Sequence, residues 1–243
     1  MTDTKKSLYG GPLQSRRGLL MGAAVLATVG VGASLLQSFF RSPRADADAR
    51  KQAKRPRRPT AVASEELMKA GPLPELTIGR DDAPVTIVEY ASMTCGACAT
   101  FHTTVLPVLK EKYIDTGKVR LVFREFPLDE RAALASMVTR CVGSDKTFPL
   151  ISVLLSKQDE WAFSKTDFQP KLFAFAQQAG FTQAAYKACR ENQDLIKKII
   201  AVRDRAHQSF GVTQTPTFFV NGKKLDGGSI EAFEKAIAPL LKG

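Results

Sequence analysis

Residues 85–98 read VTIVEYASMTCGAC, and this stretch decides the fold. Its first six residues are mostly β-branched or apolar, which is typical of a buried strand. The strand runs directly into a Cys-x-x-Cys pair, Cys95 and Cys98. Residues 99–113 place apolar side chains at helical spacing behind the pair, and Pro107 would kink this helix.

A second apolar run follows the expected helix. Residues 119–126 read VRLVFREF, and Gly117 separates this run from the helix. A strand, a helix and a second strand in this order predict a βαβ unit, in which a right-handed crossover joins two parallel strands. The cysteine pair then lies at the junction between the first strand and its helix.

The rest of the chain predicts a helical block followed by a hairpin. Between residues 129 and 210 the pattern indicates five helices, over residues 130–142, 145–156, 167–179, 183–190 and 194–210. Residues 215–225 read TPTFFVNGKKL, in which Asn221-Gly222 is typical of a two-residue hairpin turn. Residues 229–241 predict a closing helix.

The N-terminal segment has the organisation of an export signal. Residues 18–40 contain no charged side chain, and Arg16 and Arg17 precede them in a motif that resembles the twin-arginine signal. The apolar run is long enough to cross a bilayer, so residues 1–40 are expected to be either a cleaved export signal or a retained membrane anchor. Residues 41–72 are rich in basic residues and contain prolines, and they predict a linker. Residues 41–63 are expected to be extended, with a short helical turn at about residues 64–69.

The net charge of +11 belongs mostly to this N-terminal segment. Residues 1–60 hold 12 Lys and Arg residues against three acidic residues, and the remaining 23 basic and 21 acidic residues leave a net charge of only +2. A nearly neutral folded part gives little support to nucleic-acid binding. The four cysteines suit an oxidising compartment but are too few for a disulfide-rich scaffold.

Three motifs in this order resemble the DsbA family, over about residues 73–243. They are residues 89–98 (EYASMTCGAC), 126–129 (FPLD) and 211–222 (GVTQTPTFFVNG). The resemblance implies an α/β thioredoxin fold with a helical insertion domain at about residues 129–210. It also implies a thiol–disulfide oxidoreductase that forms, or isomerises, disulfide bonds in exported proteins.

The two cysteines of the pair have different expected roles. The thiolate is the reactive form in disulfide exchange. Cys95 lies at the start of a helix, where unpaired N–H groups and the helix dipole favour an anion, so we expect it to be the attacking thiol. Cys98 lies one turn later and is expected to close the ring. Gly96-Ala97 between them contains no His, unlike the strongly oxidising members of the family that the chain resembles, so the direction of the redox reaction stays open.

The resemblance also gives roles to Thr215, Pro216 and Glu89. It implies a cis bond between Thr215 and Pro216 close to the cysteine pair, which leaves backbone groups of Thr215 free to bind an extended substrate. The hydroxyl of Thr215 would lie near the sulfurs, where this position tunes redox behaviour within the family. Glu89 matches an acidic residue beneath the active site that moves a proton to or from the inner cysteine.

The other two cysteines, Cys141 and Cys189, fall in the expected helical insertion, 48 positions apart. They predict a structural disulfide, which would stabilise the fold by roughly 3–4 kcal/mol in the chain-entropy model. Two buried free thiols are the alternative.

Two rival functions would use the same redox cysteines. Cys95, Cys98 and His102 could bind a metal ion in a metal-handling protein, although a structural zinc site would need a fourth ligand. A non-catalytic thioredoxin-like binding module would carry the pair as an inert disulfide. His102 is otherwise expected to be an ordinary residue on the face of the helix, and no metal site is predicted.

The resemblance implies partners but no cofactor, because the Cys95–Cys98 disulfide is itself the redox group. The substrates would be unfolded or cysteine-containing exported proteins in the periplasm. A membrane protein of the DsbB or DsbD type would recycle the pair. Residues 64–76 are too short to form a dimerisation domain, so a monomer is expected.

Overall fold

The computed structural model describes residues 61–242. The predicted export signal or anchor at residues 1–40 lies outside this range, as does most of the predicted linker. Helix α2 (Ala61–Met68) opens the described part. Within it, none of the helices combines the length and the apolar composition that a bilayer-spanning segment needs.

The fold is built on a five-stranded mixed sheet with the strand order β1-β3-β2-β4-β5. The strands are β1 (Leu76–Ile78), β2 (Val85–Ala91), β3 (Val119–Glu125), β4 (Thr217–Val220) and β5 (Lys223–Leu225). β2 and β3 are parallel, as the βαβ pattern predicted, and the other neighbouring pairs are antiparallel. Since β2 is the central strand, the cysteine pair that follows it lies at the middle of one end of the sheet.

The helix behind the cysteine pair is divided into four segments. They are α3 (Gly96–Thr100), η1 (Phe101–Val105), α4 (Leu106–Leu109) and η2 (Lys110–Ile114). Both η segments are π-helical, and the Leu106 N–H donates to the Phe101 carbonyl, five residues back. Pro107 has no N–H and would clash with the preceding turn of a regular α-helix, so the wider π turn accommodates it.

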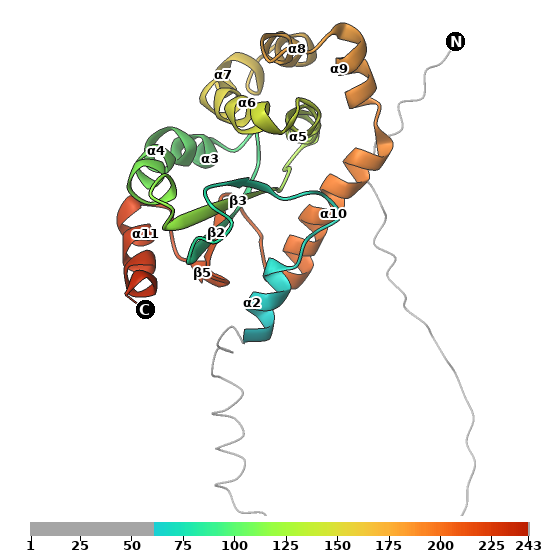
Figure 1. The fold of residues 1–243 in the computed structure, drawn as a ribbon. Coiled ribbons are helices and arrows are strands. Elements are labelled where there is room, and N and C mark those ends of the chain that lie inside the picture. Colours follow the sequence, from blue (N-terminus) through green and yellow to red (C-terminus); the bar gives the residue numbers. More distant parts are fainter. Residues whose placement is uncertain (1–60, 243) are drawn as a thin grey trace, which may run out of the picture. The chain divides into compact units, whose positions relative to one another are not determined.

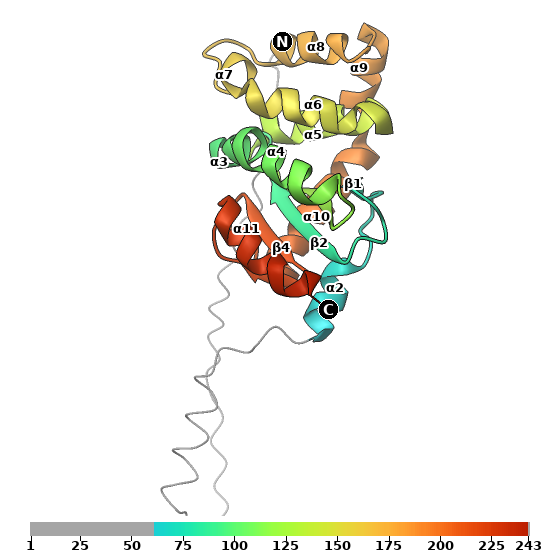
Figure 2. The same ribbon diagram turned by 60° about the vertical axis from the view of Figure 1, so that its left-hand side comes forward.

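The insertion domain lies between β3 and β4. Its helices are α5 (Glu130–Cys141), α6 (Ser144–Ser156), α7 (Gln158–Trp161), α8 (Gln169–Gln178), α9 (Gln183–Arg190) and α10 (Gln193–Phe210). Helices α5 to α9 stack beyond one end of the sheet, and α10 runs back from them alongside the strands, as Figure 1 and Figure 2 show. Five of these helices match the ranges expected from the sequence, and α7 was not predicted.

Helices cover both faces of the sheet, as Figure 1 shows. On one face, Phe101 of the divided helix and Phe233 of α11 (Ile230–Ile237) pack together against the strands. A short helical turn, η3 (Ala238–Leu241), follows α11. On the other face, α10 and α2 cover the sheet, and Leu67 of α2 is buried there. Both sides of the central strand are therefore shielded from water up to the point where the cysteine pair follows it.

Helix α2 corrects the predicted boundary between linker and domain. It lies within residues 41–72, which were assigned to the linker with a short helical turn at residues 64–69, yet it packs on the sheet as part of the domain. Nη1 of Arg124 donates to the Leu67 carbonyl at 2.8 Å, and Nη1 of Arg205 donates to the Lys69 carbonyl at 3.0 Å. The last carbonyls of a helix have no partner within the helix, so these arginines satisfy the end of α2. The folded domain therefore includes α2.

Candidate redox site

The cysteine pair lies at the N-terminal end of the divided helix. Cys95 is the N-cap of α3, and the Cys98 N–H donates to its sulfur at 3.4 Å. Both residues are free thiols, and Cys95 is partly exposed whereas Cys98 is fully buried. The site thus presents one sulfur to solvent and keeps the other inside the fold.

The two thiols have opposite acidities. The pKa of Cys95 is lowered to about 5, and the largest cause is a hydrogen bond from the Cys98 thiol. Hydrogen bonds from the Thr215 side chain and from the backbone N–H groups of Cys98 and Ala97 lower it further, and together these outweigh the effect of partial burial. The pKa of the Cys98 thiol is raised, first by the same hydrogen bond, then by burial and by the charge of Glu89. At neutral pH, Cys95 is therefore a thiolate and Cys98 holds the proton.

The loop that contains Thr215 and Pro216 lies against the pair. The peptide bond between them is cis, and the Thr215 carbonyl oxygen lies 3.2 Å from the Cys95 sulfur. The Thr215 hydroxyl is buried and has no hydrogen-bond partner of good geometry in residues 61–242, so its proton is available to that sulfur. The structure thus brings together Cys95 and a loop 120 residues away in the chain.

A groove of about 630 Å³ lies beside this loop. One wall is formed by the divided helix, including Ala97 and Phe101, and the other by residues 214–218 and 224–228. An extended polypeptide that pairs with the backbone next to Pro216 would lie in this groove and reach the Cys95 sulfur.

Glu89 lies on β2 and is fully buried, and its partner is His102. Nε2 of His102 lies 3.0 Å from one carboxylate oxygen of Glu89 and 3.2 Å from the other. The expectation that His102 is an ordinary helix-face residue was wrong, because its side chain is buried against the sheet. The signal in the sequence was its position four residues after Cys98, which places both side chains on one face of the helix.

The residues of the described domain include no group of three or more His, Cys, Asp and Glu side chains that could hold a metal ion. His102 is bonded to Glu89 rather than directed at the sulfurs as a third ligand. No observation on these residues favours the metal-binding alternative.

Two side chains hold the loop before Cys95: Gln158, which the sequence did not single out, and Asp129, the last residue of the FPLD motif. Gln158 of α7 donates from Nε2 to the Met93 carbonyl at 2.9 Å and to the Cys95 carbonyl at 3.0 Å. Asp129 accepts a hydrogen bond from the Thr94 hydroxyl at 2.7 Å and also caps the N-terminus of α5. Both contacts tie the insertion domain to the redox loop.

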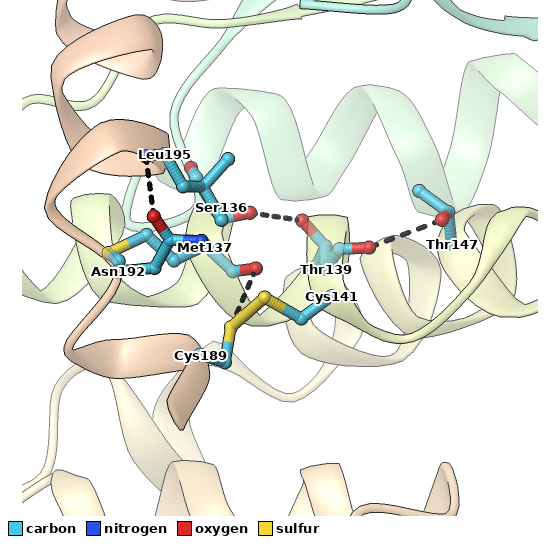
Figure 3. The surroundings of a disulfide bond; sticks show 8 residues. All are labelled: Ser136, Met137, Thr139, Cys141, Thr147, Cys189, Asn192 and Leu195. Atoms are coloured by element: carbon cyan, nitrogen blue, oxygen red, sulfur yellow. Dashed lines mark hydrogen bonds between the residues drawn. A yellow bond between two sulfur atoms is a disulfide. The ribbon is translucent and has the colours of Figure 1, made fainter. Parts of the chain in front are cut away.

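The remaining cysteines, Cys141 and Cys189, form the disulfide that the sequence predicted, and Figure 3 shows its surroundings. The bond joins the end of α5 to the end of α9. The Cys189 sulfur lies 3.2 Å from the Met137 carbonyl oxygen. This contact is not a hydrogen bond, because the Cys189 sulfur is bonded to the Cys141 sulfur and carries no hydrogen. Cys189 packs with Met137 and Ile199, in a cluster separate from the one that contains Cys98.

Sequence relatives point to the same chemistry. The family model described as Thioredoxin matches residues 73–238. A putative protein-disulfide oxidoreductase of Rickettsia bellii is 35% identical over 164 residues, which cover 67% of this chain and 63% of the relative. A probable disulfide bond formation protein D of Bacillus cereus is 31% identical over 176 residues, 68% of this chain and 78% of that protein. The chain thus spans less than two thirds of the Rickettsia relative.

Solved structures give the same fold. The crystal structure of Wolbachia pipientis alpha-DsbA1 is similar with a TM-score of 0.67 and 32% identity, over 74% of this chain and 96% of that chain. That of BdbD from Bacillus subtilis has a TM-score of 0.59 at 24% identity, a likeness of fold. With its helical insertion between β3 and β4 and its cysteine pair at the end of the central strand, the chain belongs to the thioredoxin family, in the DsbA-like group.

Proposed function

We propose that the protein is a thiol–disulfide oxidoreductase that forms disulfide bonds in exported proteins through Cys95 and Cys98. The observation that carries this proposal is the geometry of the pair: the Cys95 sulfur caps a helix N-terminus beside the cis Thr215–Pro216 bond, and Cys98 is buried behind it. These surroundings lower the pKa of Cys95 to about 5 and raise that of Cys98. A low pKa of the attacking thiol stabilises the reduced pair, and a disulfide whose reduced form is stabilised is a strong oxidant. This favours oxidation of substrate dithiols over reduction of substrate disulfides.

The reaction proceeds by two exchanges. A substrate thiolate attacks the Cys95 sulfur of the oxidised pair, the Cys95–Cys98 bond breaks, and Cys98 leaves as a thiolate that takes up a proton. A second substrate thiolate then attacks the substrate sulfur of this mixed disulfide, which forms the substrate disulfide and releases Cys95 as a thiolate. Two electrons pass from the substrate to the cysteine pair.

The substrate binds in the groove beside Pro216. The Thr215 backbone lies next to the Cys95 sulfur, so an extended chain that pairs with this loop brings its own cysteine within reach. Main-chain pairing of this kind is largely independent of sequence, which suits an enzyme whose substrates are many unfolded proteins.

The reduced pair must be reoxidised after each cycle. We propose a membrane redox partner of the DsbB or DsbD type, and action in the periplasm as a monomer. The enzyme needs no bound cofactor for this cycle, because the Cys95–Cys98 disulfide itself carries the two electrons.

Trapping tests the proposal. Cys98→Ser removes the thiol that closes the pair, while a serine hydroxyl can still donate to the Cys95 sulfur. Exported proteins should then accumulate as mixed disulfides on Cys95, and the matched variant Cys95→Ser should trap none. If no adduct forms with Cys98→Ser in the exported compartment, the proposal is rejected.

A redox titration against glutathione tests the direction of the reaction. An oxidase of this kind should have a reduction potential above about −200 mV, whereas a value near the thioredoxin value of about −270 mV would indicate a reductase. Refolding of a substrate with scrambled disulfides measures isomerisation separately, since that activity needs no net electron transfer.

A further inference from the structure

The Glu89–His102 pair is a polar contact in otherwise apolar surroundings beneath Cys98. The register of the sheet places Glu89 between Phe123 of β3 and Phe218 of β4, and both rings are buried. A buried carboxylate without a partner is strongly destabilising. In the part of the chain that the structure describes, His102 is the side chain that hydrogen bonds to it.

The surroundings of the imidazole indicate which ring nitrogen carries the proton. Nδ1 of His102 is buried and has no hydrogen-bond partner among residues 61–242, and the rings of Phe101 and Phe123 lie edge-on at centroid distances of 5.4 and 5.8 Å. A proton on Nδ1 would be a buried donor without an acceptor, which costs about 1–3 kcal/mol. Nε2 instead faces two carboxylate oxygens. Only a neutral imidazole protonated on Nε2 leaves no donor unsatisfied.

We propose that His102 is the positioning residue for proton transfer at Cys98, holding the Glu89 carboxylate through its Nε2–H as the proton acceptor. The proposal rests on the redox function proposed above. His102 follows Cys98 by four residues, so the helix directs both side chains to the same face, where Glu89 lies. The imidazole keeps the carboxylate in place, and it does not take the proton itself.

The step in question closes the pair after a mixed disulfide has formed on Cys95. Glu89 accepts the proton of the Cys98 thiol and becomes a neutral acid. The Cys98 thiolate attacks the Cys95 sulfur, the Cys95–Cys98 bond forms, and the other half of the mixed disulfide leaves as a thiolate with the electron pair of the broken bond. Glu89 then passes the proton to water.

The other charged groups near this face are already engaged. Glu125 of β3 lies on the same side of the sheet, but it is paired with Arg140. Arg124 points to the opposite face, where it binds Glu75. Cys95 is bound in the mixed disulfide during this step, so it has no thiolate that could accept the proton, and its sulfur is the centre under attack. Glu89 is therefore the base that Cys98 can use.

An aromatic disulfide, Ellman's reagent, separates the two steps on the purified, reduced full-length protein. Cys95 attacks the reagent and releases one coloured thiolate, and the attack of Cys98 on the resulting adduct releases a second. Stopped-flow absorbance across a pH series therefore gives one rate for Cys95 and another for the closing step. The first rate serves as an internal control for the fold of the site.

A matched pair of variants isolates the Nε2–H. His102→Gln places an amide donor near the position of Nε2, whereas His102→Asn is equally polar but too short to reach Glu89. In His102→Asn, the pH at which the rate of the second phase is half its maximum should rise by about one unit. Well below this pH, the second phase should then be about tenfold slower than in the wild type. His102→Gln should stay within about twofold of the wild type. The first phase should change in neither variant.

Further variants make each outcome decisive. In a Glu89→Gln background the second phase should be slow, and adding His102→Asn should slow it no further, because the two residues act through one carboxylate. Thr104→Ala, exposed on the same π turn, is the surface control. If His102→Asn does not fold, His102→Leu, which suits the apolar surroundings and has no donor, replaces it with the same expected shift.

An unchanged rate of the second phase in His102→Asn, or in His102→Leu where it replaces it, would overturn the proposal. A shift in His102→Gln as large as that in His102→Asn would also overturn it, since the imidazole would then take the proton itself. If the wild-type protein releases only one thiolate, the pair does not close, and the proposed function fails whatever the His102 variants do.

Discussion

Nε2 of Gln158 lies 3.0 Å from the carbonyl oxygen of Cys95, so a side chain of the insertion domain binds the backbone of the attacking cysteine. The same amide donates to the Met93 carbonyl at 2.9 Å, and Gln158 is buried. The insertion domain therefore does more than cover the end of the sheet. It fixes the loop from which the reactive sulfur projects.

Gln158→Leu should destabilise the protein by about 1–3 kcal/mol, because it leaves the buried Met93 carbonyl without the Gln158 donor, while the Cys95 carbonyl keeps the Ala99 N–H. Urea denaturation of the reduced protein measures this loss. Gln177→Leu, on the exposed surface of α8, is the matched control and should change stability by less than about 0.5 kcal/mol. Equal losses in the two variants would mean that the Met93 carbonyl finds another donor.

Thr215→Val should raise the pKa of Cys95 above its value of about 5. Valine keeps the shape of the side chain but removes the hydroxyl that stabilises the thiolate, and a rise of roughly one unit is expected for one lost donor. The ultraviolet absorbance of the thiolate, followed across pH, measures this pKa. Thr213→Val changes an exposed threonine of the same loop and should leave it unaltered. An unaltered pKa in Thr215→Val as well would exclude the hydroxyl as a donor.

Between about pH 5 and pH 9, the reduced protein should become more stable relative to the oxidised protein as the pH rises. The pKa of Cys95 is about 5 in the folded protein, against an ordinary value of 9.0. A lowered pKa stabilises the folded protein, and this stability is complete above about pH 9 and is lost as the pH falls to about 5. The oxidised protein has no Cys95 thiol to titrate. Denaturation of both forms across pH isolates the effect.

The raised pKa of Cys98 sets the upper limit of this window. Above about pH 9 the unfolded chain loses the Cys98 proton while the folded chain keeps it, so the stability of the reduced form should fall again. Parallel pH profiles for the two redox forms would contradict both pKa assignments.

The sequence predicted the parts of the site that lie close together in the chain or within one of the three motifs. Cys95 and Cys98 are three residues apart, and the cis bond before Pro216 agrees with what the family motif implied. Asn221 and Gly222 form the predicted turn, both with positive φ, which few residue types adopt readily.

The rest depends on which surfaces meet, and a linear pattern does not contain that information. His102 is the partner of Glu89 because the divided helix packs the face that carries His102 against β2. The four-residue spacing from Cys98 alone did not distinguish a buried hydrogen-bonded pair from a metal ligand. Gln158 lies in a four-residue helix, too short to show a periodicity. Strand β1 has only three residues, and its place in the sheet depends on antiparallel pairing with β3.

Replacing both cysteines of the structural disulfide, Cys141→Ala with Cys189→Ala, should cost roughly 3–4 kcal/mol, because the bond closes a long loop of the unfolded chain. Urea denaturation measures the loss. The pKa of Cys95 should stay at about 5, since no group near this bond contributes to it. A loss below about 1 kcal/mol would mean that packing around Met137 and Ile199 holds the two helices together without the bond.

Arg205 holds the end of helix α2 on the domain. Its guanidinium donates to the carbonyl oxygens of Lys69 at 3.0 Å and Ala70 at 3.5 Å, and it is paired with Glu66. α2 has eight residues, and a helix of this length is not stable in water by itself. Its order therefore depends on these hydrogen bonds, on the contact of Arg124 with the Leu67 carbonyl, and on the burial of the Leu67 side chain.

Arg205→Met should make residues 61–70 more sensitive to limited proteolysis, while the rest of the domain stays resistant. Methionine keeps the packing of the aliphatic stem and removes the donors that bind the carbonyls. Arg203→Met is the matched control, because Arg203 lies on the same helix but pairs with Asp204 rather than with α2. Faster cleavage in Arg205→Met alone, mapped by mass spectrometry, would identify the guanidinium as the anchor. Equal cleavage in both variants would leave the buried Leu67 as the contact that holds α2.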